Sequence, residues 1–119
     1  MPDMTDKELA AALRHCPPAA LEAARRFRRT RDAVHLPTIL LGVLERYAGP
    51  ETAPLLRSAH DGLRLTEDLG VDSLSRLELA LLLEEVLQVS LPEEQLRAVR
   101  TLGDVRRLTE DATRQRAVA

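Results

Sequence analysis

Apolar side chains recur three and four positions apart along most of this chain, which is the spacing of helices, and no segment alternates apolar and polar positions as strands do. Near the N-terminus, Thr5 and Glu8 match the capping-box pattern that begins a helix, and the proline pair starting at Pro17 would end it. The pattern therefore predicts one helix over residues 6–15 and a second over residues 18–30.

Helical spacing resumes over residues 37–47, where Gly49 and Pro50 supply the stop. Residues 51–71 have the composition of a long connection, with a short helical turn near residues 53–58. Three leucines in this connection are spaced to enter the core, namely Leu63, Leu65 and Leu69.

The longest apolar-periodic run covers residues 73–88, and two further helices are predicted over residues 91–99 and 102–114. One face of the longest helix is expected to be buried, formed by Leu77, Ala80, Leu83 and Leu87. The same helix holds three more leucines, Leu79, Leu81 and Leu82, so one or two of its leucines should remain exposed. An all-α fold follows.

Composition adds limits to this picture. A chain of 119 residues is long enough for one domain with a modest core and an appendage. Aromatic residues are limited to Phe27 and Tyr47, so the core must be built from Leu, Val, Ile and Ala. The net charge of −2 argues against a nucleic-acid-binding protein that relies on global positive charge.

Other classes of site also lack their signals. The single cysteine, Cys16, cannot form an internal disulfide, and the histidines are not spaced as metal ligands. No apolar run is long enough for a signal peptide or a membrane span. No nucleophile, base and orienting acid stand at interpretable spacing. We therefore expect a cytoplasmic protein that is not an enzyme and has neither a metal site nor a membrane span.

The clearest candidate site is Ser73. Gly70 tolerates the backbone angles of a tight turn, and Asp72 is a favourable N-cap for the helix that follows. Ser73 should therefore project from the start of a helix, where unpaired backbone N–H groups and the helix dipole favour an anion. An attached phosphodiester would suit this position.

Residues 68–74, Asp-Leu-Gly-Val-Asp-Ser-Leu, are followed in order and at matching spacing by Glu78, an acidic pair, Ser-Leu-Pro-Glu-Glu and Thr-Leu-Gly-Asp-Val. In this respect the chain resembles the acyl carrier protein family over roughly residues 37–111. The resemblance implies a four-helix acyl-carrier-like bundle with a long loop between its first two helices. Residues 37–119 would form this acyl carrier domain, and residues 1–36 an N-terminal extension of one or two helices.

In that family the serine equivalent to Ser73 carries 4′-phosphopantetheine, which a phosphopantetheinyl transferase takes from coenzyme A. Asp72 resembles the aspartate that helps to present the serine to the transferase. The resemblance thus implies a protein that carries fatty-acid or polyketide-type acyl groups as thioesters and catalyses nothing. Arg76 departs from the family habit, since acids or neutral residues are more usual there.

The resemblance also implies two sets of contact residues. Ketosynthase and other acyl-processing enzymes would dock on an acidic and apolar surface formed by Leu74, Glu78, Leu81, Glu84 and Glu85. The acyl chain would fold against apolar residues, for which the candidates are Leu69, Leu74, Leu77, Leu96 and Val99.

Two alternatives remain open at the level of the sequence. The acidic residues are equally typical of a solvated helix face, so the chain could be a helical adaptor that binds partners and carries nothing. The N-terminal 36 residues hold seven basic and five acidic side chains, a net +2, against ten and fourteen in the remainder, a net −4. The arginine-rich second helix of this extension could dock on the acidic face, pair with a neighbouring protomer or a dedicated enzyme, or merely lengthen the bundle.

Overall fold

The computed structural model describes residues 4–118, and helices account for most of them. The prediction of an all-α fold is confirmed, because the described residues contain only one isolated bridge, between Arg64 and Thr101, in place of any strand. None of the helices in this part of the chain is both long and apolar enough to cross a membrane. The α-helices are α1 (Asp6–Ala12), α2 (Pro18–Thr30), α3 (Leu36–Tyr47), α4 (Ala53–Arg57), α5 (Ser73–Leu87), α6 (Glu93–Ala98) and α7 (Leu102–Val118), and the 3₁₀ turns are η1 (Ala33–His35) and η2 (Pro50–Thr52).

Local chemistry sets the ends of several helices. Thr5 and Glu8 form the predicted capping box of α1, with the Glu8 N–H donating to Thr5 Oγ1 at 3.1 Å. Helix α6 begins later than predicted, at Glu93, because Pro92 has a non-helical ψ of 134° and is the N-cap. Helix α7 extends past its predicted end at residue 114 and reaches Val118. Helix α1 ends at Ala12, before its predicted end at residue 15.

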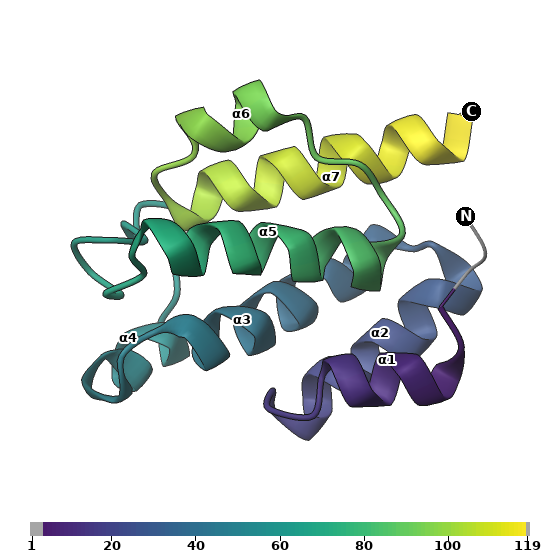
Figure 1. Cartoon of the computed structure of the whole chain (residues 1–119), viewed down its shortest axis with the longest axis horizontal. Coiled ribbons are helices and arrows are strands. Elements are labelled where there is room, and N and C mark those ends of the chain that lie inside the picture. The colour runs from purple at the N-terminus through teal and green to yellow at the C-terminus, as the bar shows by residue number, and fades with distance from the viewer. Residues whose placement is uncertain (1–3, 119) are drawn as a thin grey trace.

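Helix α5 lies between two layers (Figure 1). Helices α6 and α7 lie above it in this view, while α3 and the pair α1 and α2 lie below. The predicted buried face of α5 was partly wrong, because Leu77 is 55% exposed while Leu79 and Leu82 are buried. Since helices cover α5 from both layers, a wider arc of it is buried and the centre of that arc moves towards Leu79 and Leu82.

The N-terminal helices share the core of the remaining chain. Leu9, Leu13 and Phe27 are at most 2% exposed and belong to the same apolar cluster as the buried residues of α3, α5 and α7. Helices α2 and α3 approach closely at Gly42, where an added Cβ would lie 2.4 Å from the Cβ of Ala20. The radius of gyration of 13.4 Å agrees with one compact unit of this length, so α1 and α2 do not stand apart.

Arg31 fastens the end of α2 to the end of α5. Its backbone is left-handed, with φ of 56°, and this turns the chain out of α2. Its Nη1 donates to the carbonyl of Leu87 at 2.7 Å, and its guanidinium lies 4.5 Å from the centroid of the Phe27 ring. A cation at the C-terminal end of α5 also complements the helix dipole.

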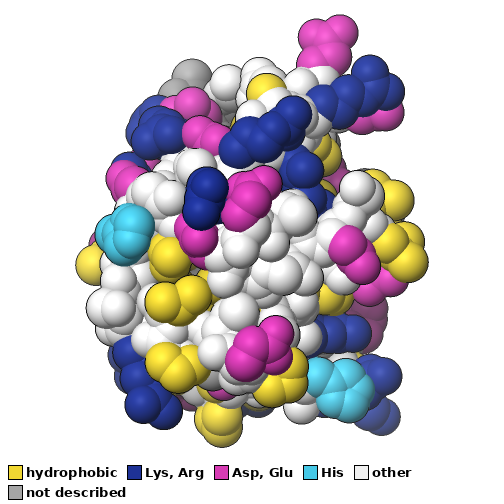
Figure 2. Space-filling view, turned by 90° about the vertical axis from the view of Figure 1, so that its left-hand side faces the viewer, with side chains coloured by type: hydrophobic (Ala, Val, Ile, Leu, Met, Phe, Trp, Pro, Cys, Tyr) yellow, Lys and Arg dark blue, Asp and Glu magenta, His cyan; other side chains and the backbone are white. Residues whose placement is uncertain are grey.

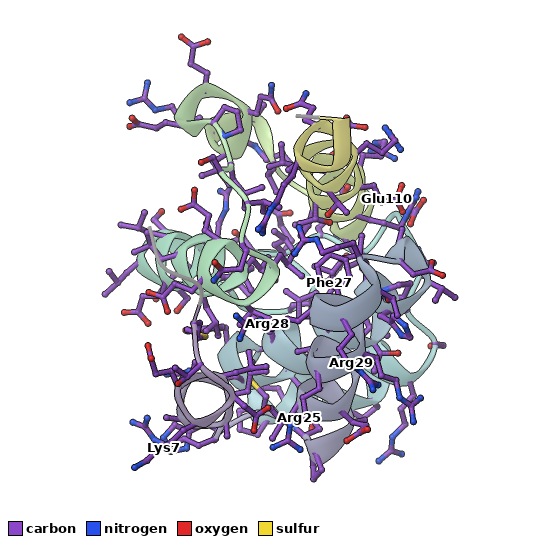
Figure 3. The ribbon with its side chains drawn as sticks, turned by 90° about the vertical axis from the view of Figure 1, so that its right-hand side faces the viewer. Lys7, Arg25, Phe27, Arg28, Arg29 and Glu110 are labelled. Atoms are coloured by element: carbon purple, nitrogen blue, oxygen red, sulfur yellow. The ribbon has the colours of Figure 1, made fainter. Side chains whose placement is uncertain are left out.

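Replacement of Phe27 tests whether the N-terminal helices are part of the core. In Figure 3, Phe27 and Arg29 lie on the same helix, with Phe27 towards the interior. Phe27→Ala should lower the free energy of unfolding by about 3–5 kcal/mol, because it leaves a cavity in the shared core. Urea denaturation followed by circular dichroism measures this change.

The exposed Arg29→Ala is the matched control and should change the free energy of unfolding by less than about 0.5 kcal/mol. A Phe27→Ala variant as stable as this control would show that α2 only rests on the outside of the bundle.

Candidate functional site

Ser73 is the first residue of α5, and its side chain is exposed. Gly70, with φ of 70°, makes the turn that leads into the helix, a conformation that favours glycine. Asp72 is the N-cap, and its Oδ1 accepts from the Ser75 N–H at 2.8 Å. The structure therefore places the Ser73 hydroxyl in solvent at a capped helix start.

The loop before Ser73 is held by the core and by α7. Leu63, Leu65 and Leu69 are at most 4% exposed, so the prediction that they enter the core is confirmed. The Leu65 N–H donates to the Arg100 carbonyl at 2.9 Å, and the Leu102 N–H donates to the Leu63 carbonyl at 2.8 Å. Burial in the core and hydrogen bonds to residues 100 and 102 therefore hold the loop that leads to Ser73.

Asp68 accepts hydrogen bonds from Arg64, another residue of the same loop. Its carboxylate accepts from the Arg64 backbone N–H at 2.8 Å and from the Arg64 guanidinium at 3.1 and 3.3 Å. The Arg64 side chain first, and then its backbone N–H, hold the pKa of Asp68 below its ordinary value. Hydrogen bonds from the Ser75 backbone N–H and then its side chain lower the pKa of the N-cap Asp72 in the same way.

An apolar cavity of about 360 Å³ opens beside Ser73, between α5, α6 and α7. Of the residues predicted to shelter a chain, Leu77, Leu96 and Val99 line it. Leu69 does not line it, because it is fully buried where its carbonyl accepts from the Gly49 N–H at 3.1 Å. The cavity is further lined by apolar residues of α5, of α7 and of the segments that precede α5 and α6, namely Leu65, Leu79, Ala80, Leu83, Leu91, Val105 and Leu108.

Three arginines also line this cavity, namely Arg76, Arg97 and Arg100. The sequence shows Arg76 and the arginines of the last two helices as unusual for the family it resembles, but their gathering at one cavity depends on how α5, α6 and α7 pack. Figure 2 views the molecule from the side of the α5 N-terminus and shows basic and acidic side chains gathered in its upper part, with apolar side chains below and at one edge.

The family described as phosphopantetheine attachment site matches residues 59–108, which include the turn, Ser73 and the helices around the cavity. Over these residues the chain is similar to phosphopantetheine-binding carrier proteins. It is 40% identical over 48 residues to the acyl carrier protein of Sulfurovum sp. (strain NBC37-1), and 43% identical over 47 residues to that of Wolinella succinogenes. The matched segment covers 40% of this chain in both comparisons.

Other relatives match over a shorter stretch. The acyl carrier protein of Clostridium perfringens is 46% identical over 39 residues, which are 33% of this chain and 51% of that protein. The chain spans 64% and 62% of the Sulfurovum and Wolinella proteins, so less than two thirds of their length. No solved structure matches the chain significantly.

Helix α5 also presents an apolar stripe to solvent. Leu74, Leu77 and Leu81 are 65%, 55% and 52% exposed, and their spacing places them on one side of the helix. Glu78 and Glu85 are exposed on the same side. Glu84 differs from them, because it is half-buried and its Oε2 accepts from the Leu91 N–H at 2.9 Å.

A pH series tests the role of Asp68 in holding the loop. Its lowered pKa means that this interaction stabilises the fold fully above the ordinary carboxyl pKa of about 4, and that the stabilisation is lost as the pH falls through the lower folded value. Asp68→Asn should therefore be less stable than the parent at pH 7, and the difference should shrink between about pH 4 and pH 2. Urea denaturation at pH 7, 4 and 2 measures the difference.

Glu94→Gln is the control, since Glu94 is exposed on α6. A deficit of Asp68→Asn that stays constant over the whole pH series would contradict the assigned role.

Proposed function

We propose that this protein carries acyl groups of the fatty-acid or polyketide type on a 4′-phosphopantetheine arm attached to Ser73. The observation that supports the proposal is the exposed Ser73 hydroxyl at the edge of an apolar cavity of about 360 Å³. The similarity to acyl carrier proteins supports a carrier in preference to an enzyme. When attached, the arm supplies a thiol that holds an acyl group as a thioester.

The residues around Ser73 fit this group. The hydroxyl is accessible, so a transferase can join Ser73 Oγ to the phosphorus of the pantetheine arm. The bond between this phosphorus and the nucleotide part of coenzyme A breaks in the same step, and the serine hydroxyl loses its proton. Asp72 contributes by capping α5 through Ser75, and this holds the first turn and the serine ready for the transferase. The start of the helix favours the phosphodiester that results.

The cavity supplies shelter for an acyl chain. Leu77, Leu96 and Val99 form part of its wall, and an apolar chain that enters it leaves water. Leu77 also belongs to the exposed stripe of α5, so it can contact either a chain in the cavity or a partner protein.

Partner enzymes are proposed to dock on α5. Leu74 and Leu81 provide exposed apolar contacts, and Glu78 and Glu85 provide negative charge beside them. Glu84 contributes charge from a fixed position, because its carboxylate also holds the Leu91 N–H. Contacts of this kind form quickly and are weakened by salt, which suits a cytoplasmic carrier that visits a phosphopantetheinyl transferase, a ketosynthase and other acyl-processing enzymes in turn.

Loading in vitro tests the attachment site. The protein is incubated with coenzyme A, magnesium and a broad-specificity phosphopantetheinyl transferase, and intact mass is recorded. The parent should gain the mass of one phosphopantetheine group, and Ser73→Ala should gain none, because it lacks the accepting oxygen.

Ser75→Ala is the matched control, since Ser75 lies on the same turn and its backbone N–H still reaches Asp72. It should be loaded like the parent. A parent that remains unmodified under conditions that load another carrier would favour the non-carrying adaptor.

Charge reversal tests the docking surface. Glu78→Lys combined with Glu85→Lys should lower the kcat/KM of loading by roughly tenfold at low ionic strength, because it replaces attraction to a basic partner with repulsion. The effect should diminish as salt is added. Glu94→Lys, on the exposed side of α6, should change the rate little, and an equal loss in both variants would indicate that only net charge matters.

A further inference from the structure

Arg76 crosses one wall of the cavity that lies beside Ser73. It is half-buried, lines the cavity and donates through Nη2 to the carbonyl of Val99 at the C-terminal end of α6. Arg100 Nη1 donates to the same carbonyl at 3.0 Å. Two guanidinium groups thus meet at one carbonyl beside an otherwise leucine-rich cavity.

Neither of these two charges is balanced by a carboxylate among residues 4–118. The ion pairs of this part of the chain include Arg97 with Glu93, at 2.8 Å, but involve neither Arg76 nor Arg100. Arg76 is half-buried and has only a carbonyl dipole for a partner among the described residues, so its charge is incompletely compensated. Arg100 is exposed to solvent and also donates to the Arg97 carbonyl, at 2.7 Å. An oxygen-bearing ligand in the cavity would improve that compensation.

Arg76 is also free to turn towards such a ligand at little cost. If it leaves Val99, the Val99 carbonyl keeps the hydrogen bond from Arg100, so no buried acceptor is left without a partner. The guanidinium presents several N–H donors in a plane and can bind two neighbouring oxygens at once.

The position of Arg76 decides which part of a ligand it meets. Arg76 follows Ser73 by three residues, so the two side chains are neighbours on one side of α5. Both line the cavity. A chain that enters beside Ser73 would bring its attached end, with the thioester carbonyl and the adjacent carbons, closest to Arg76.

We propose that Arg76 makes this cavity selective for acyl groups with a second oxygen close to the thioester, namely 3-oxoacyl chains, over saturated chains of equal length. The inference rests on the proposed attachment of the arm at Ser73. In a 3-oxoacyl group three carbon atoms link the two carbonyl oxygens. Both oxygens can therefore accept hydrogen bonds from one guanidinium. A saturated chain offers only the thioester oxygen and leaves the second donor unused.

The test compares two cargoes on the same protein. Arms that end in a hydrolysis-stable amide carrying either an octanoyl or a 3-oxooctanoyl group are attached to Ser73, and thermal midpoints are measured. The 3-oxooctanoyl form of the parent should melt about 3 °C or more above the octanoyl form, as expected for one charge-assisted contact in a domain of this size. In Arg76→Gln the difference should fall below about 1 °C, because the fork of charged donors is gone.

Each variant is compared only with itself, so a general loss of stability in Arg76→Gln cancels. Arg76→Lys keeps the charge but not the planar fork and should retain less than half of the difference. Arg97→Gln is the matched control, since this arginine lines the same cavity but is paired with Glu93, and it should keep the full difference.

Equal midpoints for the two cargoes in the parent, or an undiminished difference in Arg76→Gln, would overturn the inference. It would also be overturned if attaching the arm without any acyl group raised the midpoint of the parent but not that of Arg76→Gln, because Arg76 would then serve the phosphodiester. Intact mass separates these results from failure of the proposed function, which would appear as an arm that is never attached at Ser73.

Discussion

The burial of α5 between two layers of helices is the constraint on which the remainder of this structure depends. Its buried arc packs towards α1, α2 and α3 in one direction and towards α6 and α7 in the other. An arc this wide leaves only one stripe of α5 and its first turn in contact with solvent. Those two exposed parts hold the proposed docking residues and Ser73. The proposed functional surface therefore consists of the part of α5 that is not buried in the core.

The N-terminal helices take part in this constraint at the far end of α5. Phe27 is buried on the inner side of α2. Arg31 contacts the ring of Phe27 and donates to the last carbonyl of α5. The end of α5 opposite Ser73 is therefore closed by the extension, while the end that carries Ser73 stays open. The added layer can thus stabilise the bundle without covering Ser73, the proposed attachment site.

Packing also explains why a cavity remains beside Ser73. Helix α6 is only one and a half turns long, and its connection to α5 runs through the buried Leu91, which the Glu84 carboxylate holds by its N–H. Short helices carry few side chains with which to fill the space above α5. Arg76 links α5 to the end of α6 through the Val99 carbonyl, to which Arg100 also donates, and this gives the cavity one charged edge in an apolar wall.

The sequence by itself determined the helical segments, the capping box at Thr5, the turn at Gly70 and the start of α5 at Ser73, because each depends on the chemistry of a few adjacent residues. It also indicated the buried leucines of the long loop from their spacing. Only the tertiary structure decided that Leu77 is exposed, that Glu84 holds Leu91, that Leu69 lies away from the cavity and that Arg76 crosses to Val99. These features depend on which helices cover α5 and from how many sides, and helical periodicity identifies an apolar face without fixing how wide a part of it is buried.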